Sequence, residues 1–531
     1  MNTKPVVALL ALLAPLTLAQ TSSAARAGTP AGQLALLTQA TPDARVNAAL
    51  GQLDALARQT LERTHIPGMA IAVVYKDQVV YLKGFGVREV GKEGSVDPDT
   101  VFQLASMSKP LASTVVARLV GEGVVGWDDP VVWHDPGFEL SEPAATREVT
   151  LRDLFSHHSG LPEVAPDLLE DLGFGRDEIL YRLRYLPLPK GFRGQYAYSN
   201  YGITEGAVAA AKAAGQSWED LSAQKLYEPL GMTSTSSRLS DYLAAKDRAS
   251  LHVLVGGKYV ARYQRDPDPQ SPAGGVSSTV RDLAQWLRLQ LAGGKFNGRQ
   301  LISTDALRET YVPEARRASP GNPATDRTGF YGLGWDIDYD SAGRVRIGHS
   351  GAFMLGASTT VTMVPSADLG IVVLTNAAPV GASEAVAQTF MDTALDGKPQ
   401  RDWAALYQQA FEAMSAGVLA SSDYSKPPQP VAPALPPSSY VGTYTSDFYG
   451  NVQIVERGGG LTLVIGPRQL QYPLTHYDRD VFTFAPTGES ARTISGLTFQ
   501  IGLDQKASSL NIESLDVAGQ GTFTRVVGGA P

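Results

Sequence analysis

Residues 102–120 of this 531-residue chain, FQLASMSKPLASTVVARLV, have a helical apolar pattern with Ser106 and Lys109 where the helix is expected to begin. Residues three apart share one face of a helix, so the hydroxyl and the amine can come within hydrogen-bonding distance. Free N–H groups at a helix start carry partial positive charge, which lowers the pKa of a lysine and stabilises an oxyanion. The stretch therefore indicates a candidate serine nucleophile beside a lysine base.

The same Ser-x-x-Lys spacing occurs at Ser222 and Lys225, which serve as an internal comparison. That pair lies in residues 217–230, SWEDLSAQKLYEPL, whose pattern is that of an ordinary amphipathic helix. We expect no catalytic role there. The spacing alone is weak evidence, and Ser106 needs support from elsewhere in the chain.

A second candidate segment, GFRGQYAYSNYGIT, spans residues 191–204. Tyr198 and Asn200 are two positions apart, so both side chains point the same way if the segment is extended. A phenol near an ammonium group is expected to have a lowered pKa and to carry protons, while an amide can hold a lysine or a substrate carbonyl. The alternative for Tyr198 is a loop residue that packs on the surface.

A third segment, RVRIGHSGAFMLGASTTVTMVP, spans residues 344–365 and contains His349, Ser350 and Gly351 between two β-rich runs. Glycine at position 351 would let a substrate approach the backbone closely. We therefore expect a strand edge that faces a binding site.

Residues 348–352, GHSGA, also resemble a nucleophile elbow centred on Ser350, with the last glycine of G-x-S-x-G replaced by alanine. That motif needs a helix directly after the serine, but the following residues are rich in Thr and Val. It also needs a later Asp and His, and the only later histidine is His476, in the C-terminal β-rich region. We favour the strand edge.

Together, SMSK at 106–109, YSN at 198–200 and HSG at 349–351 resemble the three motifs of penicillin-binding-protein-like serine hydrolases, in order and in spacing. The branch resembled is that of class C β-lactamases, D-amino-acid peptidases and β-lactamase-fold esterases. The resemblance covers roughly residues 45–400. Flanking segments also resemble the family, namely LRDLFSHHSGLP (151–162), EPLGM (228–232), AGGVSSTVRDLAQW (273–286) and YGLGW (331–335).

The resemblance implies an acyl-enzyme mechanism without a cofactor or metal. Ser106 would be the nucleophile, and a partly neutral Lys109 would help to deprotonate it. Tyr198 would pass protons to the leaving group and later activate water. Asn200 would orient Lys109 and the substrate carbonyl.

The resemblance also implies an oxyanion hole between two backbone N–H groups, those of Ser106 and Ala352. Ala352 follows the third motif on the expected strand edge. Ser350 and Gly351 would line the substrate beside it.

The third motif departs from the commonest family pattern at His349. β-Lactamases and transpeptidases commonly have lysine there, a permanent cation that can hold a substrate carboxylate, whereas histidine is mostly neutral at pH 7. Efficient β-lactam hydrolysis is therefore not expected, and peptide, amide or ester substrates are favoured. The alternatives are a class C-like β-lactamase and a non-catalytic protein that binds penicillin or cell-wall peptides. All four of the candidate catalytic residues are present, which favours an enzyme.

For residues 45–415 the resemblance implies an α/β fold in which helices flank an antiparallel sheet, with an additional all-helical subdomain. The periodicity of apolar residues agrees with this fold. It predicts a helix from Asn47, a hairpin over 69–90 with its turn at 76–78, and late strands over 357–365 and 369–376. Further helical patterns lie at 168–183, 201–214, 282–291 and 382–395. Strands at both ends of the domain indicate one sheet built from its two termini.

The chain then changes character. Residues 416–437 are predicted to be a linker, because six of the thirteen residues over 425–437 are proline. Residues 438–531 contain about eight short runs rich in β-branched and aromatic residues, which predicts a small β-barrel or sandwich. This tail resembles the lipocalin-like domain of some family members. The sequence leaves its role, and self-association, open.

The N-terminus has the layout of a bacterial-type signal peptide, with Lys4 before an apolar run and small residues near the expected cleavage sites after Ala19 or near Ala25. We expect residues 1–25 to be removed, residues 26–44 to be flexible, and the protein to be secreted or periplasmic. The run is short for a membrane span, so no stable insertion is expected after cleavage.

Composition excludes several other mechanisms. The chain has no cysteine, which removes thiol nucleophiles, disulfides and thiolate metal sites. A net charge of −8 without a basic stripe argues against nucleic acid as a partner. His157 and His158 are adjacent, do not share a helix face and are interpreted as structural rather than metal-binding, as is His134. Residues 312–327 are interpreted as a surface loop, and the alternative is a lid with Arg316 or Arg317 facing an anionic substrate.

Overall fold

The computed structural model describes residues 42–317, 327–417, 423–489 and 494–526. The expected signal peptide lies outside these ranges. The first helix, α1 (Pro42–Thr64), begins inside the segment that was expected to be flexible, so residues 42–44 are helical. Within the described ranges, no helix is both long and apolar enough to cross a membrane, and no group of three or more His, Asp or Glu side chains is arranged to hold a metal ion.

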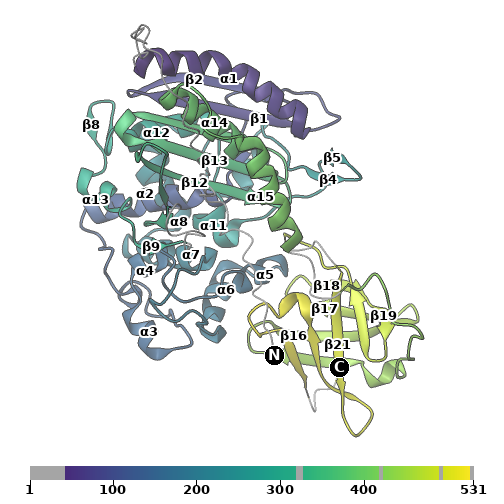
Figure 1. Ribbon diagram of the computed structural model, residues 1–531. Coiled ribbons are helices and arrows are strands. Elements are labelled where there is room, and N and C mark those ends of the chain that lie inside the picture. The colour runs from purple at the N-terminus through teal and green to yellow at the C-terminus, as the bar shows by residue number, and fades with distance from the viewer. Residues whose placement is uncertain (1–41, 318–326, 418–422, 490–493, 527–531) are drawn as a thin grey trace, which may run out of the picture.

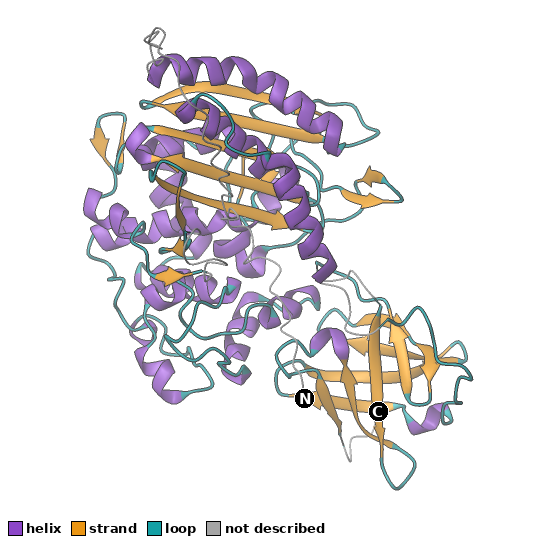
Figure 2. Ribbon diagram, viewed as in Figure 1, coloured by secondary structure: helices purple, strands orange, loops and turns teal. Residues whose placement is uncertain are grey.

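The first domain, here named the hydrolase domain, extends from α1 to α15 (Trp403–Gly417). It is built on one antiparallel sheet of eight strands in the order β2-β1-β14-β13-β12-β11-β10-β9 (Figures 1 and 2). The first hairpin lies beside the last strand, with Met69 opposite Thr375, which confirms that the two ends of the domain form one sheet. The strands are β1 (Gly68–Tyr75), β2 (Gln78–Gly86), β9 (Ala315–Arg316), β10 (Phe330–Tyr331), β11 (Asp336–Tyr339), β12 (Val345–Phe353), β13 (Ala357–Val364) and β14 (Leu369–Thr375).

Helices cover both faces of this sheet. On one face α1 packs with α14 (Ala382–Asp396), and on the other lie α2 (Ser108–Gly121) and α12 (Val280–Leu291). Strand β1 is consequently an unbroken apolar run, because alternate residues enter opposite cores: Ile71 faces α1 and α14, while Ala72 faces the core of α2 and α12.

The helical subdomain lies beside the edge of the sheet that ends in β9 (Figure 1). The helical pattern over 168–183 forms two helices rather than one, α5 (Ala165–Asp171) and α6 (Arg176–Arg182). Gly173 has a φ of +93° and Gly175 precedes α6, so the chain turns between them. The remaining helices near the site are α4 (Leu151–Phe155), α7 (Asn200–Ala213), α8 (Trp218–Ser222) and α11 (Ser271–Gly274).

After α15 (Trp403–Gly417) and the proline-rich segment, the chain forms a separate, nearly closed antiparallel barrel of nine strands, drawn in yellow-green and yellow in Figure 1. Eight strands were expected; the ninth, β19, follows a break at Pro473 and Leu474. The strands are β15 (Gly442–Ser446), β16 (Gly450–Arg457), β17 (Gly460–Ile465), β18 (Leu470–Pro473), β19 (Thr475–Asp478), β20 (Val481–Phe484), β21 (Ser495–Ile501), β22 (Ala507–Ile512) and β23 (Thr522–Arg525).

Candidate active site

Ser106 lies in a short 3₁₀ turn, Ala105–Met107, directly before α2 rather than inside the α-helix. Ala105 has a φ of +50°, a conformation that non-glycine residues seldom adopt and that often marks a functional turn. The Ser108 hydroxyl donates to the Ala105 carbonyl at 2.7 Å and accepts from the Val276 N–H at 3.0 Å. Both bonds hold the turn in this conformation.

Lys109 is completely buried and directs its amine at three oxygens. The Nζ atom lies 3.0 Å from Ser106 Oγ, 2.6 Å from Asn200 Oδ1 and 2.9 Å from the carbonyl of Ala273. Burial lowers the pKa of Lys109 to about 7, although the charges of two nearby carboxylates partly oppose this. A substantial share of neutral amine is therefore present near pH 7, with a lone pair available for the serine proton.

Tyr198 approaches Ser106 from the other side: its hydroxyl donates to Ser106 Oγ at 2.8 Å. The expected lowering of its pKa is wrong, because burial raises the pKa of Tyr198 well above 10. Lys109 Nζ lies 4.6 Å from the centre of the ring, and the desolvation of the phenolate outweighs any benefit from the ammonium. The resting tyrosine is thus a neutral proton donor.

Asn200 begins α7 and connects Lys109 to a carboxylate that lies outside the three sequence motifs. Its Nδ2 donates to Asp167 Oδ1 at 2.7 Å, and Gln270 Nε2 donates to the same oxygen at 3.2 Å. Burial raises the pKa of Asp167 to about 6. Asp167 lies in the first turn of α5, where an acidic residue is ordinary, so no sequence signal marks it.

The third motif lies on β12, which pairs with β11 only as far as Gly348. Residues 349–353 extend beyond β11, so they have no partner from that strand along the edge. His349 Nε2 hydrogen-bonds to the Tyr331 hydroxyl at 3.0 Å, and Nδ1 to the Ser350 carbonyl at 2.7 Å. Burial and the charge of Lys109 hold the pKa of His349 well below 6.5, so this position is neutral, as expected.

Gly351 brings the β12 edge directly against the turn that carries Ser106. A Cβ at this position would lie 2.2 Å from the Leu104 carbonyl oxygen and 2.9 Å from the Met107 nitrogen, so only glycine fits. The Thr359 hydroxyl on β13 also donates to the Leu104 carbonyl, at 2.7 Å. Ala352, the next residue along this edge, is therefore held near the same turn.

Ser350 does not face the site, which corrects its expected place beside the substrate. Its hydroxyl donates to Thr360 Oγ1 at 3.0 Å, and successive side chains on a strand point to opposite faces. The residues after it continue β12 as far as Phe353 rather than starting a helix. The nucleophile-elbow interpretation is therefore wrong, because Ser350 faces away from the site and no helix follows it directly.

Aromatic rings enclose the second motif. The His157 imidazole lies 4.5 Å from the Tyr198 ring and 4.7 Å from the Tyr331 ring, measured between centroids. Its Nδ1 accepts from the Ser199 N–H at 3.0 Å. Burial lowers the pKa of His157, so it is neutral and suited to accept this bond. As expected, His157 has a structural place near the site.

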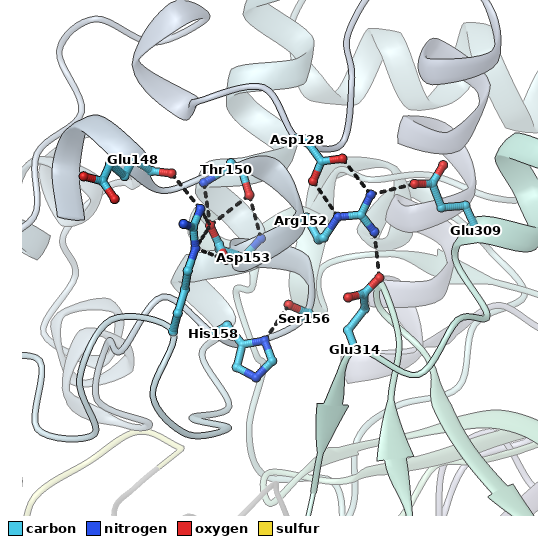
Figure 3. Close-up of polar contacts among 10 residues, drawn as sticks. Asp128, Glu148, Thr150, Arg152, Asp153, Ser156, His158, Glu309 and Glu314 are labelled. Carbon is cyan, nitrogen blue, oxygen red and sulfur yellow. Dashed lines mark hydrogen bonds and ion pairs between the residues drawn. The ribbon is translucent and has the colours of Figure 1, made fainter. Parts of the chain in front are cut away.

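An ion-pair network holds α4, the helix that ends two residues before His157 (Figure 3). The Arg152 guanidinium on α4 bonds to three carboxylates, those of Asp128, Glu309 and Glu314, at 2.6–2.7 Å. Glu314 directly precedes β9, so the network links α4 to the edge of the sheet.

Asp153, the neighbour of Arg152, holds the start of the second motif. It forms a capping box with Thr150 (Figure 3). It also accepts from Arg193 at 2.8 Å. Arg193 lies five residues before Tyr198 in the chain. The two adjacent residues of α4 therefore tie together separate segments around the site.

Residues 312–314 form the loop that we expected, with Val312 exposed, but the residues that follow do not. Residues 315–316 form β9, and Arg317 is buried with its Nη1 at 2.5 Å from Asp336 Oδ1. Arg317 is thus committed to a carboxylate, which argues against the lid hypothesis for this residue. The rest of that segment, 318–326, lies outside the described residues.

In the second Ser-x-x-Lys pair, which we expect to be inert, the two side chains have separate partners. The Ser222 hydroxyl bonds to the Glu219 carbonyl and to Ser237, while Lys225 Nζ pairs with Glu122 at 2.6 Å. The local backbone is a π-helical turn over Ala223–Tyr227, which continues α8. Spacing alone did not bring this serine and lysine together.

Comparison with known proteins shows the family of this chain. Residues 53–395 match the family model described as Beta-lactamase. The chain belongs to the beta-lactamase family. The C-terminal part of this family member, residues 426–525, matches a second model described only as a domain of unknown function, DUF3471.

Relatives and solved structures extend the likeness. The chain is 27% identical over 419 residues to an unguisins hydrolase of Aspergillus campestris, covering 74% of each chain. Its fold is similar to that of an octameric penicillin-binding protein homologue from Pyrococcus abyssi, with a TM-score of 0.57, 19% identity and coverage of 90% of this chain and 100% of that one. It is also similar to a class C beta lactamase from Rhodobacter sphaeroides, with a TM-score of 0.53, 23% identity and coverage of 65% and 99%.

The displaced pKa of Lys109 has a consequence for stability. Between pH 7 and 10.5 the unfolded chain holds a proton on this lysine that the folded chain has released, so wild-type stability rises with pH over this window. We expect Lys109→Met to gain stability relative to wild type most strongly below pH 7. That gain should fall by up to about 1.4 kcal/mol per pH unit above pH 7.

Urea unfolding of both proteins from pH 6 to pH 9 measures this difference. Lys225→Met removes the lysine of the inert pair and controls for the loss of a lysine elsewhere. A difference between wild type and Lys109→Met that is independent of pH would contradict a displaced pKa at Lys109.

Proposed function

We propose that this protein is a serine acyl hydrolase in which Ser106 forms the acyl-enzyme. The observation that carries the proposal is the placement of Ser106 Oγ between two buried groups, 3.0 Å from Lys109 Nζ and 2.8 Å from the Tyr198 hydroxyl. One of them can take a proton near neutral pH and the other can donate one. Such a pair serves both halves of an acyl transfer.

In the acylation half-reaction, neutral Lys109 takes the hydroxyl proton as Ser106 Oγ bonds to the substrate carbonyl carbon. The oxyanion that forms is stabilised by the N–H groups of Ser106 and Ala352, which Gly351 allows to lie close together. The carbonyl–nitrogen or carbonyl–oxygen bond then breaks, and the Tyr198 hydroxyl gives its proton to the leaving group.

Deacylation runs these transfers in reverse. The Tyr198 phenolate takes a proton from water, whose oxygen attacks the acyl carbon. Ser106 then leaves and regains a proton from the Lys109 ammonium. Water is consumed, both groups return to their starting states, and Asn200 holds Lys109 in register through its bond at 2.6 Å.

The charges of the site favour peptide, amide or ester substrates, including peptides with D-amino acids, over β-lactams. His349 is neutral where a lysine is common, and its two cationic neighbours are already engaged, Lys109 with three oxygens and Arg317 with Asp336. A substrate whose binding depends on an ion pair between its carboxylate and a cation of the site should therefore bind weakly. The relative named an unguisins hydrolase supports hydrolysis as the reaction.

Hydrolysis of p-nitrophenyl butyrate tests the nucleophile. We expect Ser106→Ala to lose at least about 10³-fold in kcat/KM, because no acyl-enzyme can form. Ser222→Ala, at the inert pair, and Ser350→Ala, at the rejected elbow, should retain turnover. Activity that persists in Ser106→Ala would refute the mechanism. Faster turnover of a β-lactam such as nitrocefin than of esters and D-amino-acid peptides would refute the substrate class.

The pH profile of kcat/KM tests the base. Because Lys109 must be neutral, the rate should rise with pH through a midpoint of about 7. Asp167→Asn removes a negative charge that raises the pKa of Lys109, so its midpoint should move to lower pH. Asp128 is an exposed carboxylate that pairs with Arg152. Asp128→Asn is therefore the matched control and should leave the midpoint unchanged. A midpoint that does not respond to Asp167→Asn would contradict Lys109 as the titrating group.

We further propose that the protein is exported, on the basis of the leader pattern over residues 1–25. Expression in a bacterial host should yield a processed protein in the periplasm or the medium that begins after Ala19 or near Ala25. N-terminal sequencing measures this directly, and a full-length protein that stays in the cytoplasm would contradict export.

A further inference from the structure

The barrel domain reaches the end of β12 through one carboxylate, Glu489, which follows β20. Its Oε1 accepts from the Met354 N–H, and its Oε2 accepts from the Leu355 N–H at 3.3 Å. These two N–H groups belong to the turn between β12 and β13. A carboxylate that accepts two backbone N–H groups forms charge-assisted bonds, which are stronger than neutral ones.

Glycines set the close approach of the two domains at this point. Gly488 has a φ of +113°, and a Cβ there would lie 2.5 Å from Asp171 Cγ on α5. The Glu489 N–H donates to Asp171 Oδ1 at 3.0 Å. A Cβ on Gly466 would likewise lie 2.4 Å from the Leu172 carbonyl oxygen. The loop that carries Glu489 therefore packs directly against α5, the helix that also contains Asp167.

Arg265 contacts both Glu489 and the end of β12. Its buried guanidinium pairs with Glu170 of α5 and lies 3.8 Å from Glu489 Oε2. The guanidinium carbon is 5.1 Å from the centre of the Phe353 ring, the last residue of β12. The end of β12 thus contacts a cation of the hydrolase domain and an anion of the barrel.

We propose that Glu489 is a positioning residue for the active site: by holding the turn at 354–355, the barrel domain keeps the β12 edge that carries Gly351 and Ala352 against the turn of Ser106. Ala352 is only two residues from Met354, so a shift of the turn moves the oxyanion donor with it. The effect on rate rests on the proposed function, in which the Ala352 N–H stabilises the oxyanion.

The expected kinetic signature follows from this placement. An oxyanion donor acts mainly in the transition state, so its displacement lowers kcat while KM changes little. Misplacement of a catalytic group by about 1 Å can cost on the order of 10²-fold. We expect Glu489→Ala to lower kcat by about 10- to 100-fold. Glu489→Gln keeps one carbonyl acceptor and should lose less.

Arg182→Ala is the matched control, because Arg182 makes a separate contact between the domains. Its Nη1 donates to the Phe448 carbonyl at 2.6 Å, away from the β12–β13 turn. This variant should lower the Tm without lowering kcat. Hydrogen–deuterium exchange of residues 352–357 in the full-length protein gives a readout that does not depend on turnover. Exchange there should increase in both Glu489 variants and stay at the wild-type level in Arg182→Ala.

Several results would overturn the proposal. Unchanged exchange over 352–357 in the Glu489 variants would show that the carboxylate does not hold the turn. Equal losses of kcat in Glu489→Ala and Arg182→Ala would show general docking rather than positioning. Increased exchange with an unchanged kcat would show that loosening the turn does not affect catalysis. If wild-type turnover does not depend on Ser106, the proposed function fails, and the exchange experiment still decides whether Glu489 holds the turn.

Discussion

The burial of Lys109 is the constraint on which the rest of the site depends. A lysine inside a protein loses the hydration of its ammonium group, and this lowers its pKa to about 7 here. Among the described residues, Lys109 bonds to no carboxylate directly. Its partners are a hydroxyl, an amide oxygen and a carbonyl, while Asp167 acts through its charge from behind Asn200. A direct ion pair would favour the ammonium and remove the base. The Asn200 amide lies between Lys109 and Asp167 in place of such a pair.

The surroundings of this lysine are organised to keep water out and the reacting groups in place. The His157 ring packs against both Tyr198 and Tyr331, and burial keeps all three rings neutral. The ion pairs of Arg152 and Asp153 lie further out, where partial exposure lowers the cost of charge, and they join segments distant in the sequence (Figure 3). Neutral rings therefore surround Tyr198, while the Arg317–Asp336 ion pair is buried nearby.

The barrel domain is packed into this arrangement rather than attached by its linker alone. Its glycines touch α5, and its Glu489 bonds to the turn that follows the third motif. The helix that contacts the barrel also holds Asp167, so the same element contacts the barrel at its C-terminal end and the lysine network in its first turn. This shared helix gives the second domain a physical route to the site.

Local patterns in the sequence determined the helix after Ser106, the first hairpin, the β-rich tail and the three motif segments, because each depends on residues close together in the chain. The hairpin turn is one residue shorter than expected, because Gln78 already pairs with Tyr75 as part of β2. A wrong expectation, the lowered pKa of Tyr198, came from counting a charge without the burial that surrounds it. Only the tertiary structure decided which of two Ser-x-x-Lys pairs is assembled, that Asp167 lies behind Asn200, that Ser350 faces away, and that Glu489 reaches β12 from another domain. Those contacts join residues far apart in the sequence, and their energies depend on the desolvation that folding imposes.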